Sequence, residues 1–128
     1  MSEGAWYRKG VEALRRIDPH LRDRARAAGD PRSLVRRALV QNVVPSGTRV
    51  IWIVSGRVRL SAFDAEGAET ILAVLEPGSC FGLGARRDDV VGATAEALEA
   101  TEIVTFDASA LADDPEIAAL FPVGTEAS

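Results

Sequence analysis

Residues 52–82 decide the fold, and they read WIVSGRVRLSAFDAEGAETILAVLEPGSCFG. Short runs rich in β-branched residues are separated by the turn residues Ser55-Gly56, Ala65-Glu66-Gly67 and Pro77-Gly78-Ser79. This alternation is typical of antiparallel strands joined by tight turns. Followed outward along the chain, it predicts strands at residues 34–40, 50–54, 58–63, 70–75, 80–81, 92–97 and 102–106. We therefore expect a mainly β protein, built as a sandwich or barrel.

The N-terminal region predicts helices instead of strands. Tyr7, Val11 and Leu14 recur at helical spacing, and we expect this first helix to reach about Ile17. Asp18-Pro19 supplies an N-cap followed by proline at the first helical position, which predicts a second helix that ends at Gly29.

Two short helices are also expected behind the last strand. Asp107 or Ser109 is positioned to cap a helix over Leu111, and Pro115 to begin another over Ile117. The chain is accordingly divided into a basic helical segment at 1–33, packed on or next to the β part, the β part itself at 34–122, and a frayed tail at 123–128.

Composition restricts the class of protein. The chain has 128 residues, of which 47% are hydrophobic, and this fits one globular domain. With Cys80 as the single cysteine, an intramolecular disulfide and a cysteine-ligated cluster are excluded, and a cytoplasmic location is the natural expectation. Neither a secretory signal nor a membrane-spanning run of apolar residues is visible, so no membrane association is expected.

Charge is divided unevenly along the chain. Residues 1–40 hold ten basic and five acidic side chains (+5), whereas residues 41–128 hold five basic and fourteen acidic ones (−9). The basic helix could contact nucleic acid, but we favour a solvated helix or one that docks on the acidic body. Its arginines are Arg15, Arg16, Arg22, Arg24 and Arg26.

The order of the motifs resembles a known family. The matching segments are 52–60, 71–82, 93–98, 103–107 and the helix over 111–115. Together they are similar to the cyclic-nucleotide-binding domain, as found in the effector domains of Crp/Fnr (catabolite-activator) regulators. The resemblance covers about residues 40–122. It implies an eight-stranded antiparallel β-roll, a double-stranded jelly roll, with short helices before and after it and a ligand pocket inside.

The resemblance also implies where a phosphate-binding cassette stands. In the family a glutamate follows the Phe-Gly pair and an arginine precedes Ala-Thr, but here those positions hold Leu83 and Val91. Losing two charged hydrogen bonds of roughly 1.5–3 kcal/mol each weakens binding about a hundredfold or more. Cyclic AMP is therefore a disfavoured ligand, and no cofactor is expected. The positions that carry over are Phe81, Gly82, Gly84, Ala85, Ala93 and Thr94.

Other site chemistry is not indicated. Arg86 and Arg87 lie inside the cassette and could replace the lost phosphate contact, but next to Asp88 and Asp89 they fit a solvated charge cluster better. His20 and Cys80 have no metal-binding or haem-binding motif around them, so no metal is expected. No serine, cysteine or carboxylate has a base partner in a recognisable arrangement, which predicts a protein that is not an enzyme.

Two functions remain open. The first is a regulatory module that docks on a protein partner, with a homodimer through the N-terminal helices and the cassette helix as one arrangement. The second is a sensor of a cyclic nucleotide or another small molecule in an altered pocket that uses Arg86 or Arg87, or the effector part of a Crp/Fnr-like regulator acting in trans. The 128 residues include no helix-turn-helix, so we expect no sequence-specific DNA binding by this chain alone.

Overall fold

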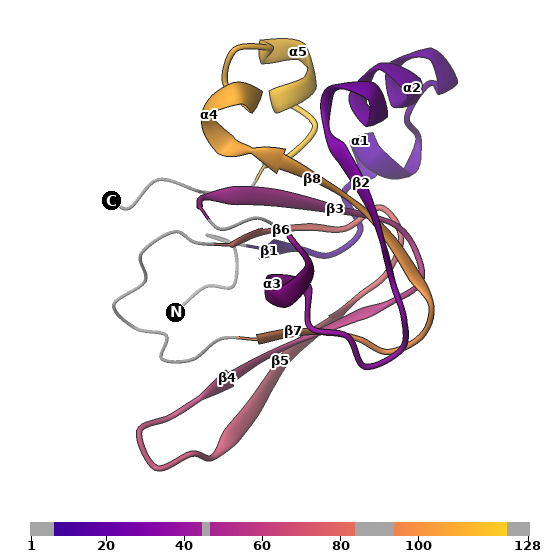
Figure 1. Cartoon of the computed structure of the whole chain (residues 1–128). Helices are drawn as coiled ribbons and strands as arrows, with labels where there is room; N and C mark the ends of the chain where they lie inside the picture. The colour runs from indigo at the N-terminus through magenta and orange to yellow at the C-terminus, as the bar shows by residue number, and fades with distance from the viewer. Residues whose placement is uncertain (1–6, 45–46, 84–93, 123–128) are drawn as a thin grey trace.

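The computed structural model describes residues 7–44, 47–83 and 94–122. Within them, eight strands form two antiparallel sheets and five short helices flank the sheets (Figure 1). The expected β-roll with helices before and after it is confirmed. The expected tail at 123–128 lies outside the described residues.

The strands divide into a large and a small sheet. The large sheet has the order β1-β6-β3-β8-β2, and the small one has the order β5-β4-β7. The strands are β1 (Tyr7–Arg8), β2 (Asp30–Leu34), β3 (Arg49–Ser55), β4 (Val58–Phe63), β5 (Glu69–Leu75), β6 (Cys80–Leu83), β7 (Thr94–Ala97) and β8 (Thr101–Asp107). The helices are α1 (Glu12–Arg15), α2 (Pro19–Ala28), α3 (Val40–Val43), α4 (Ala108–Leu111) and α5 (Pro115–Ala118).

The strand expected at residues 34–40 is wrong. The strand in this region is β2, which pairs with β8 and ends at Leu34, opposite Thr101. The chain then turns through Arg37, whose φ of 76° costs an L-residue roughly 1–2 kcal/mol. It continues as α3, because Val40 and Val44 are buried at the i, i+4 spacing of a helix face.

The first expected helix is also partly wrong. Tyr7 and Arg8 form β1, which pairs with Phe81 and Cys80 of β6, and the helix covers only Glu12–Arg15. Buried Tyr7 belongs to the apolar layer between the sheets, and this packing outweighs the helical spacing seen in the sequence. The expected boundary after residue 33 falls inside β2, and the division into segments stays a prediction.

The remaining helix signals are confirmed. The Asp18 carboxylate accepts a hydrogen bond from the Leu21 backbone N–H (3.1 Å), Pro19 opens α2, and the helix ends before Gly29. Asp107 caps α4 by accepting from two backbone N–H groups, and Pro115 opens α5.

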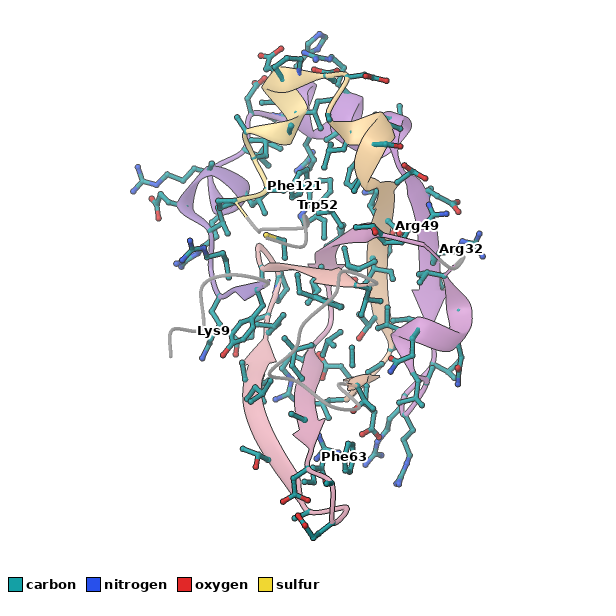
Figure 2. The ribbon with its side chains drawn as sticks, turned by 90° about the vertical axis from the view of Figure 1, so that its left-hand side faces the viewer. Lys9, Arg32, Arg49, Trp52, Phe63 and Phe121 are labelled. Atoms are coloured by element: carbon teal, nitrogen blue, oxygen red, sulfur yellow. The ribbon has the colours of Figure 1, made fainter. Side chains whose placement is uncertain are left out.

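Alternation along the large sheet creates two apolar layers. On β3, Ile51 and Ile53 face the small sheet, whereas Val50 and Trp52 face the helices. The Trp52 ring lies 5.8 Å from the ring of Phe121, between sheet and C-terminal chain (Figure 2). Trp52 is therefore a packing residue of the layer beneath the helices.

The basic N-terminal segment docks on the acidic body through two arginines of α2. Arg24 bonds Glu116 (2.7 Å) and Asp114 (3.2 Å), which belong to α5 and its N-cap. Arg26 bonds Glu102 of β8 (2.6 Å). These contacts join the two oppositely charged parts of the chain, so of the two arrangements favoured from the charge pattern, a solvated helix or a docked one, the structure shows the docked one.

Candidate ligand site

The candidate site lies where β6 ends and β7 begins. These two strands lead into and out of the expected phosphate-binding cassette, and they belong to different sheets. Six of the expected site residues, Gly84, Ala85, Arg86, Arg87, Val91 and Ala93, lie outside the described residues. The described part of the site consists of the strands on either side of the cassette.

The end of β6 is anchored in the roll. Phe81 is fully buried between the sheets and pairs with Ile51, and buried Gly82 pairs with Val50. Leu83 is partly buried and packs against the same apolar layer. At the position where the resemblance places a ribose-binding glutamate, this chain therefore has an aliphatic side chain that is used for packing.

Thr94 starts β7 and pairs with Ser61 of β4. The next residues alternate, with Ala95 and Ala97 buried between the sheets and Glu96 bonded to Arg59 on the other face. The period of two places Thr94 on the face of Glu96. A ligand inside the roll would lie on the face of Ala95 and Ala97, so the alternation gives no support to a contact with the Thr94 hydroxyl. That contact, suggested by the family pattern, stays a prediction.

The sequence reasoning missed Arg49. It is the first residue of β3, stands opposite Leu83 of β6 and Asp107 of β8, and has a half-buried side chain (Figure 2). Because alternate residues share a face, Arg49 belongs to the same face of β3 as Ile51 and Ile53. The alternation of apolar residues along this strand could have placed residue 49 on the inward face. It was not recognised because a charged residue at the end of a strand is usually solvated.

Thr105 was missed as well. It stands opposite Ile51 on β8, is 1% exposed, and its hydroxyl has no hydrogen-bond partner among the residues that the structure describes. It occupies the next inward position from Asp107, whose own partner across the strands is Arg49. A buried unsatisfied hydroxyl is costly, and it lies on the same face of the large sheet as Arg49, one inward position away along the strands.

Electrostatics at this edge are shaped by local bonds. The Ser109 hydroxyl, donating at 2.6 Å, contributes most to lowering the pKa of Asp107, followed by the backbone N–H groups of Ala110 and Ser109 and then by the charge of Arg49. Asp107 is accordingly a carboxylate at neutral pH. Its negative charge stabilises the positive charge of Arg49 on the neighbouring strand and disfavours a bound anion next to Asp107.

The structure also shows the surroundings of Cys80 and His20, the two residues considered from the sequence as metal or haem ligands. Burial raises the pKa of the Cys80 thiol to about 12, partly opposed by the charge of Arg8, so the thiol stays protonated and unreactive. His20 is exposed on α2. Among residues 7–44, 47–83 and 94–122, no three His, Cys, Asp or Glu side chains gather as a metal site would require.

Comparison with known proteins agrees with this architecture. A model of the cyclic nucleotide-binding domain family matches residues 40–113, which is more than half of the chain. The chain belongs to this family. A search of curated proteins found no match.

Solved structures share the fold at low sequence identity. The N-terminal domain of a transcriptional regulator from Streptomyces coelicolor A3(2) is 21% identical, with a TM-score of 0.58, over 84% of this chain and 83% of that one. The catabolite activator protein of Thermus thermophilus is 23% identical, with a TM-score of 0.61, over 84% of this chain and 53% of that one. A CooA variant from Carboxydothermus hydrogenoformans is 19% identical, with a TM-score of 0.61, over 84% and 70% of the two chains.

These relatives differ in length from the present chain. It spans about half of the catabolite activator protein but most of the Streptomyces domain, so the shared part is the β-roll with its adjacent helices. In the part of the chain that the structure describes, no helix has the length and apolar character needed to cross a membrane.

Proposed function

We propose that this domain is a non-enzymatic regulatory module that acts through a protein partner and has lost the binding of cyclic AMP. Leu83 carries the proposal. Its side chain packs against the apolar layer between the sheets, at the position where the family resemblance expects a glutamate for the ribose. Val91 at the expected arginine position removes the second charged contact. Two such losses weaken binding about a hundredfold or more.

Titration calorimetry of the whole chain with cyclic AMP and cyclic GMP tests this proposal. We expect no binding in the micromolar range. The matched variant carries Leu83→Glu together with Val91→Arg, which restores both charged groups, and we expect it to gain affinity for cyclic AMP. Micromolar binding by the unchanged chain would contradict the proposal.

A second candidate is a sensor of a small anionic molecule, and Thr105 favours it. A buried hydroxyl without a partner, on the same sheet face as a guanidinium, is suited to receive a polar ligand atom. Arg86 or Arg87 would then supply the charge, as the sequence suggests, because the carboxylate of Asp107 opposite Arg49 disfavours an anion at that residue. A regulator that uses this domain in trans would be a related arrangement.

Thr105→Val separates the two candidates, because it keeps the shape of the side chain and removes the hydroxyl. If the roll holds no ligand, the variant should be more stable by about 1 kcal/mol, since an unsatisfied group is lost. If the hydroxyl binds a ligand, binding of inorganic phosphate or cyclic AMP, measured by calorimetry, should weaken in the variant. The matched control is Thr70→Val, at an exposed position of β5.

A further inference from the structure

A pocket of about 210 Å³ lies on the outer side of the small sheet. Arg59 of β4 and Glu96 of β7 line it, on the sheet face that points away from the apolar layer inside the roll. The turn between β2 and α3 adds Arg36 and Arg37 to the lining. The lining thus has three arginines and one glutamate, a net charge of +2. A hollow with this excess of positive charge attracts an anion.

All three arginines of the pocket keep N–H groups that a ligand could use. Arg36 and Arg37 are exposed, and neither makes an ion pair or side-chain hydrogen bond within the residues that the structure describes. Arg59 uses its Nη2 atom, which lies 2.7 Å from the Glu96 carboxylate and 3.9 Å from that of Glu69. Its Nη1 atom makes no bond within the same residues.

The backbone holds residue 37 at the pocket in a conformation that favours glycine. Arg37 has a φ of 76°, and its N–H donates to the Ala97 carbonyl at 2.7 Å. The Ala38 carbonyl accepts from the Ala97 N–H at 2.9 Å, so the end of β7 fixes the turn on both sides of residue 37 (Figure 1). An arginine therefore occupies a strained position, although its side chain makes no bond within the described part of the chain. Strain that is retained by surrounding contacts is concentrated at functional sites.

The acidic side chains at the pocket are paired with other arginines. Glu96 of the lining bonds Arg59, and Glu99, just beyond the lining, pairs with Arg57 at 3.5 Å. Within the described residues, no ion pair neutralises the two arginines of the turn. Their positive charge is therefore available to a ligand.

Size and charge together indicate the kind of anion. The pocket is smaller than the roughly 300–1,000 Å³ that encloses a whole drug-sized ligand, so it fits one small group of a larger molecule. The planar fork of arginine binds carboxylate and phosphate oxygens alike. A phosphate monoester carries a charge of about −1.5 to −2 and three acceptor oxygens, which matches three guanidinium groups and a net charge of +2. A carboxylate offers one charge and two oxygens.

We propose that this pocket binds the phosphate group of a phosphate monoester, which Arg36 and Arg37 hold by charged hydrogen bonds. The site lies outside the roll and is separate from the interior, where the family resemblance places a cyclic nucleotide. The proposal goes beyond the proposed function and stands whether or not cyclic AMP binds. A small phosphorylated molecule and a phosphorylated side chain of another protein present the same group, and the experiment separates these two sources.

Calorimetric titration of the whole chain with O-phosphoserine at low salt provides the test. We expect binding that weakens as salt rises, and none by serine, which lacks the phosphate. Arg37→Gly should weaken the binding about tenfold or more, because one charged hydrogen bond is lost. This variant should unfold at a temperature no lower than the unchanged chain, since glycine suits the backbone there. Arg22→Ala, at an exposed arginine of α2 outside this pocket, is the matched control and should bind like the unchanged chain.

Glu96→Gln should change the affinity in the opposite direction. The amide keeps the shape of the side chain and can still accept from Arg59, but it removes the one negative charge of the lining. Binding of O-phosphoserine should therefore tighten, a gain that a merely structural role of Glu96 would not produce. Backbone amide NMR locates the site, because the signals of Arg37, Ala97 and Leu98 should shift during the titration.

Three results would overturn the proposal: no binding of O-phosphoserine at millimolar concentration, an equal loss of affinity in Arg22→Ala, or amide shifts confined to residues of the roll interior. Inorganic phosphate and a phosphoserine peptide identify the source. Equal affinity for all three probes assigns the pocket to small phosphorylated molecules, and tighter binding of the peptide assigns it to a phosphorylated protein; either result supports the proposal. Cyclic AMP is a diester and is titrated separately, so this proposal and the proposed function can fail independently.

Discussion

Gly56→Ala is the substitution for which the structure gives the clearest magnitude. Gly56 joins β3 to β4, has a φ of 87°, and lies against the turn that joins β7 to β8. A Cβ here would meet the Thr101 hydroxyl oxygen and would stand 2.6 Å from both the Ala100 carbonyl oxygen and the Thr101 Cα. Two of these three atoms are backbone, so the neighbours have little freedom to move away. The left-handed conformation costs roughly 1–2 kcal/mol and overpacking roughly 1–3 kcal/mol, which predicts a loss of about 2–5 kcal/mol.

Gly67→Ala is the matched control. Gly67 has a φ of 89°, but a Cβ there meets no atom within 4 Å, so only the conformational cost of roughly 1–2 kcal/mol is expected. Urea denaturation followed by the fluorescence of buried Trp52 measures both free energies of unfolding. Equal losses for the two variants would refute the claim that close packing against residues 100 and 101 fixes this turn.

Four further predictions concern the helices and the layer beneath them. Cys80 should resist alkylation at pH 8 in the folded chain and react after unfolding, because burial raises the pKa of its thiol to about 12; rapid labelling of the folded chain, measured by mass spectrometry, would argue against this burial. Since that pKa lies above the unfolded value, the thiol's contribution to the free energy of unfolding is lost as pH rises from about 9 to about 12, and Cys80→Ala should lack this part of the pH dependence. Phe121→Ala should lower the free energy of unfolding in urea by about 3–5 kcal/mol, because Phe121 is 5% exposed and its ring centroid lies 5.0 Å from that of Phe106. A loss below about 1 kcal/mol would show that the C-terminal chain does not pack on the sheet. Arg24→Ala should lower the free energy of unfolding slightly and only at low salt, because its pairs with α5 are exposed and screened by salt. Arg22→Ala should lower it by no measurable amount, and the reverse order, seen in urea denaturation, would contradict the docking of α2.

The fold was predictable from the sequence where local signals and packing agree. Strands β3, β4 and β5 combine β-branched residues with turn residues at both ends, and they were placed to within a residue. The caps at Asp18 and Asp107 were predictable because a cap depends only on residues within one helical turn.

The fold was not predictable where distant contacts decide the conformation. Tyr7 has helical spacing with Val11 and Leu14, but it pairs with Phe81, seventy-four positions away, and packs between the sheets. Residues 35–40 have the composition of a strand, yet the chain turns there: the Arg37 N–H donates to the Ala97 carbonyl, and the Ala38 carbonyl accepts from the Ala97 N–H. Tertiary contacts outweigh local preference at both places.

The candidate site was predictable only in outline. Phe81, Gly82 and Leu83 were identified from the family pattern, and the structure places them at the end of a buried strand. Arg49 and Thr105 were missed, because their relation to Leu83 arises from strand pairing across β6, β3 and β8. A single sequence contains no signal for the partner of a strand.

The central proposal is that this member of the cyclic nucleotide-binding domain family does not bind cyclic AMP, and thermal unfolding tests it most directly. A ligand at a hundred times its dissociation constant stabilises a folded protein by about 2.7 kcal/mol, which for a domain of this size raises Tm by several degrees. We predict that millimolar cyclic AMP leaves the Tm of the unchanged chain where it is, while it raises the Tm of the variant with Leu83→Glu and Val91→Arg. A clear rise in the unchanged chain would contradict the account.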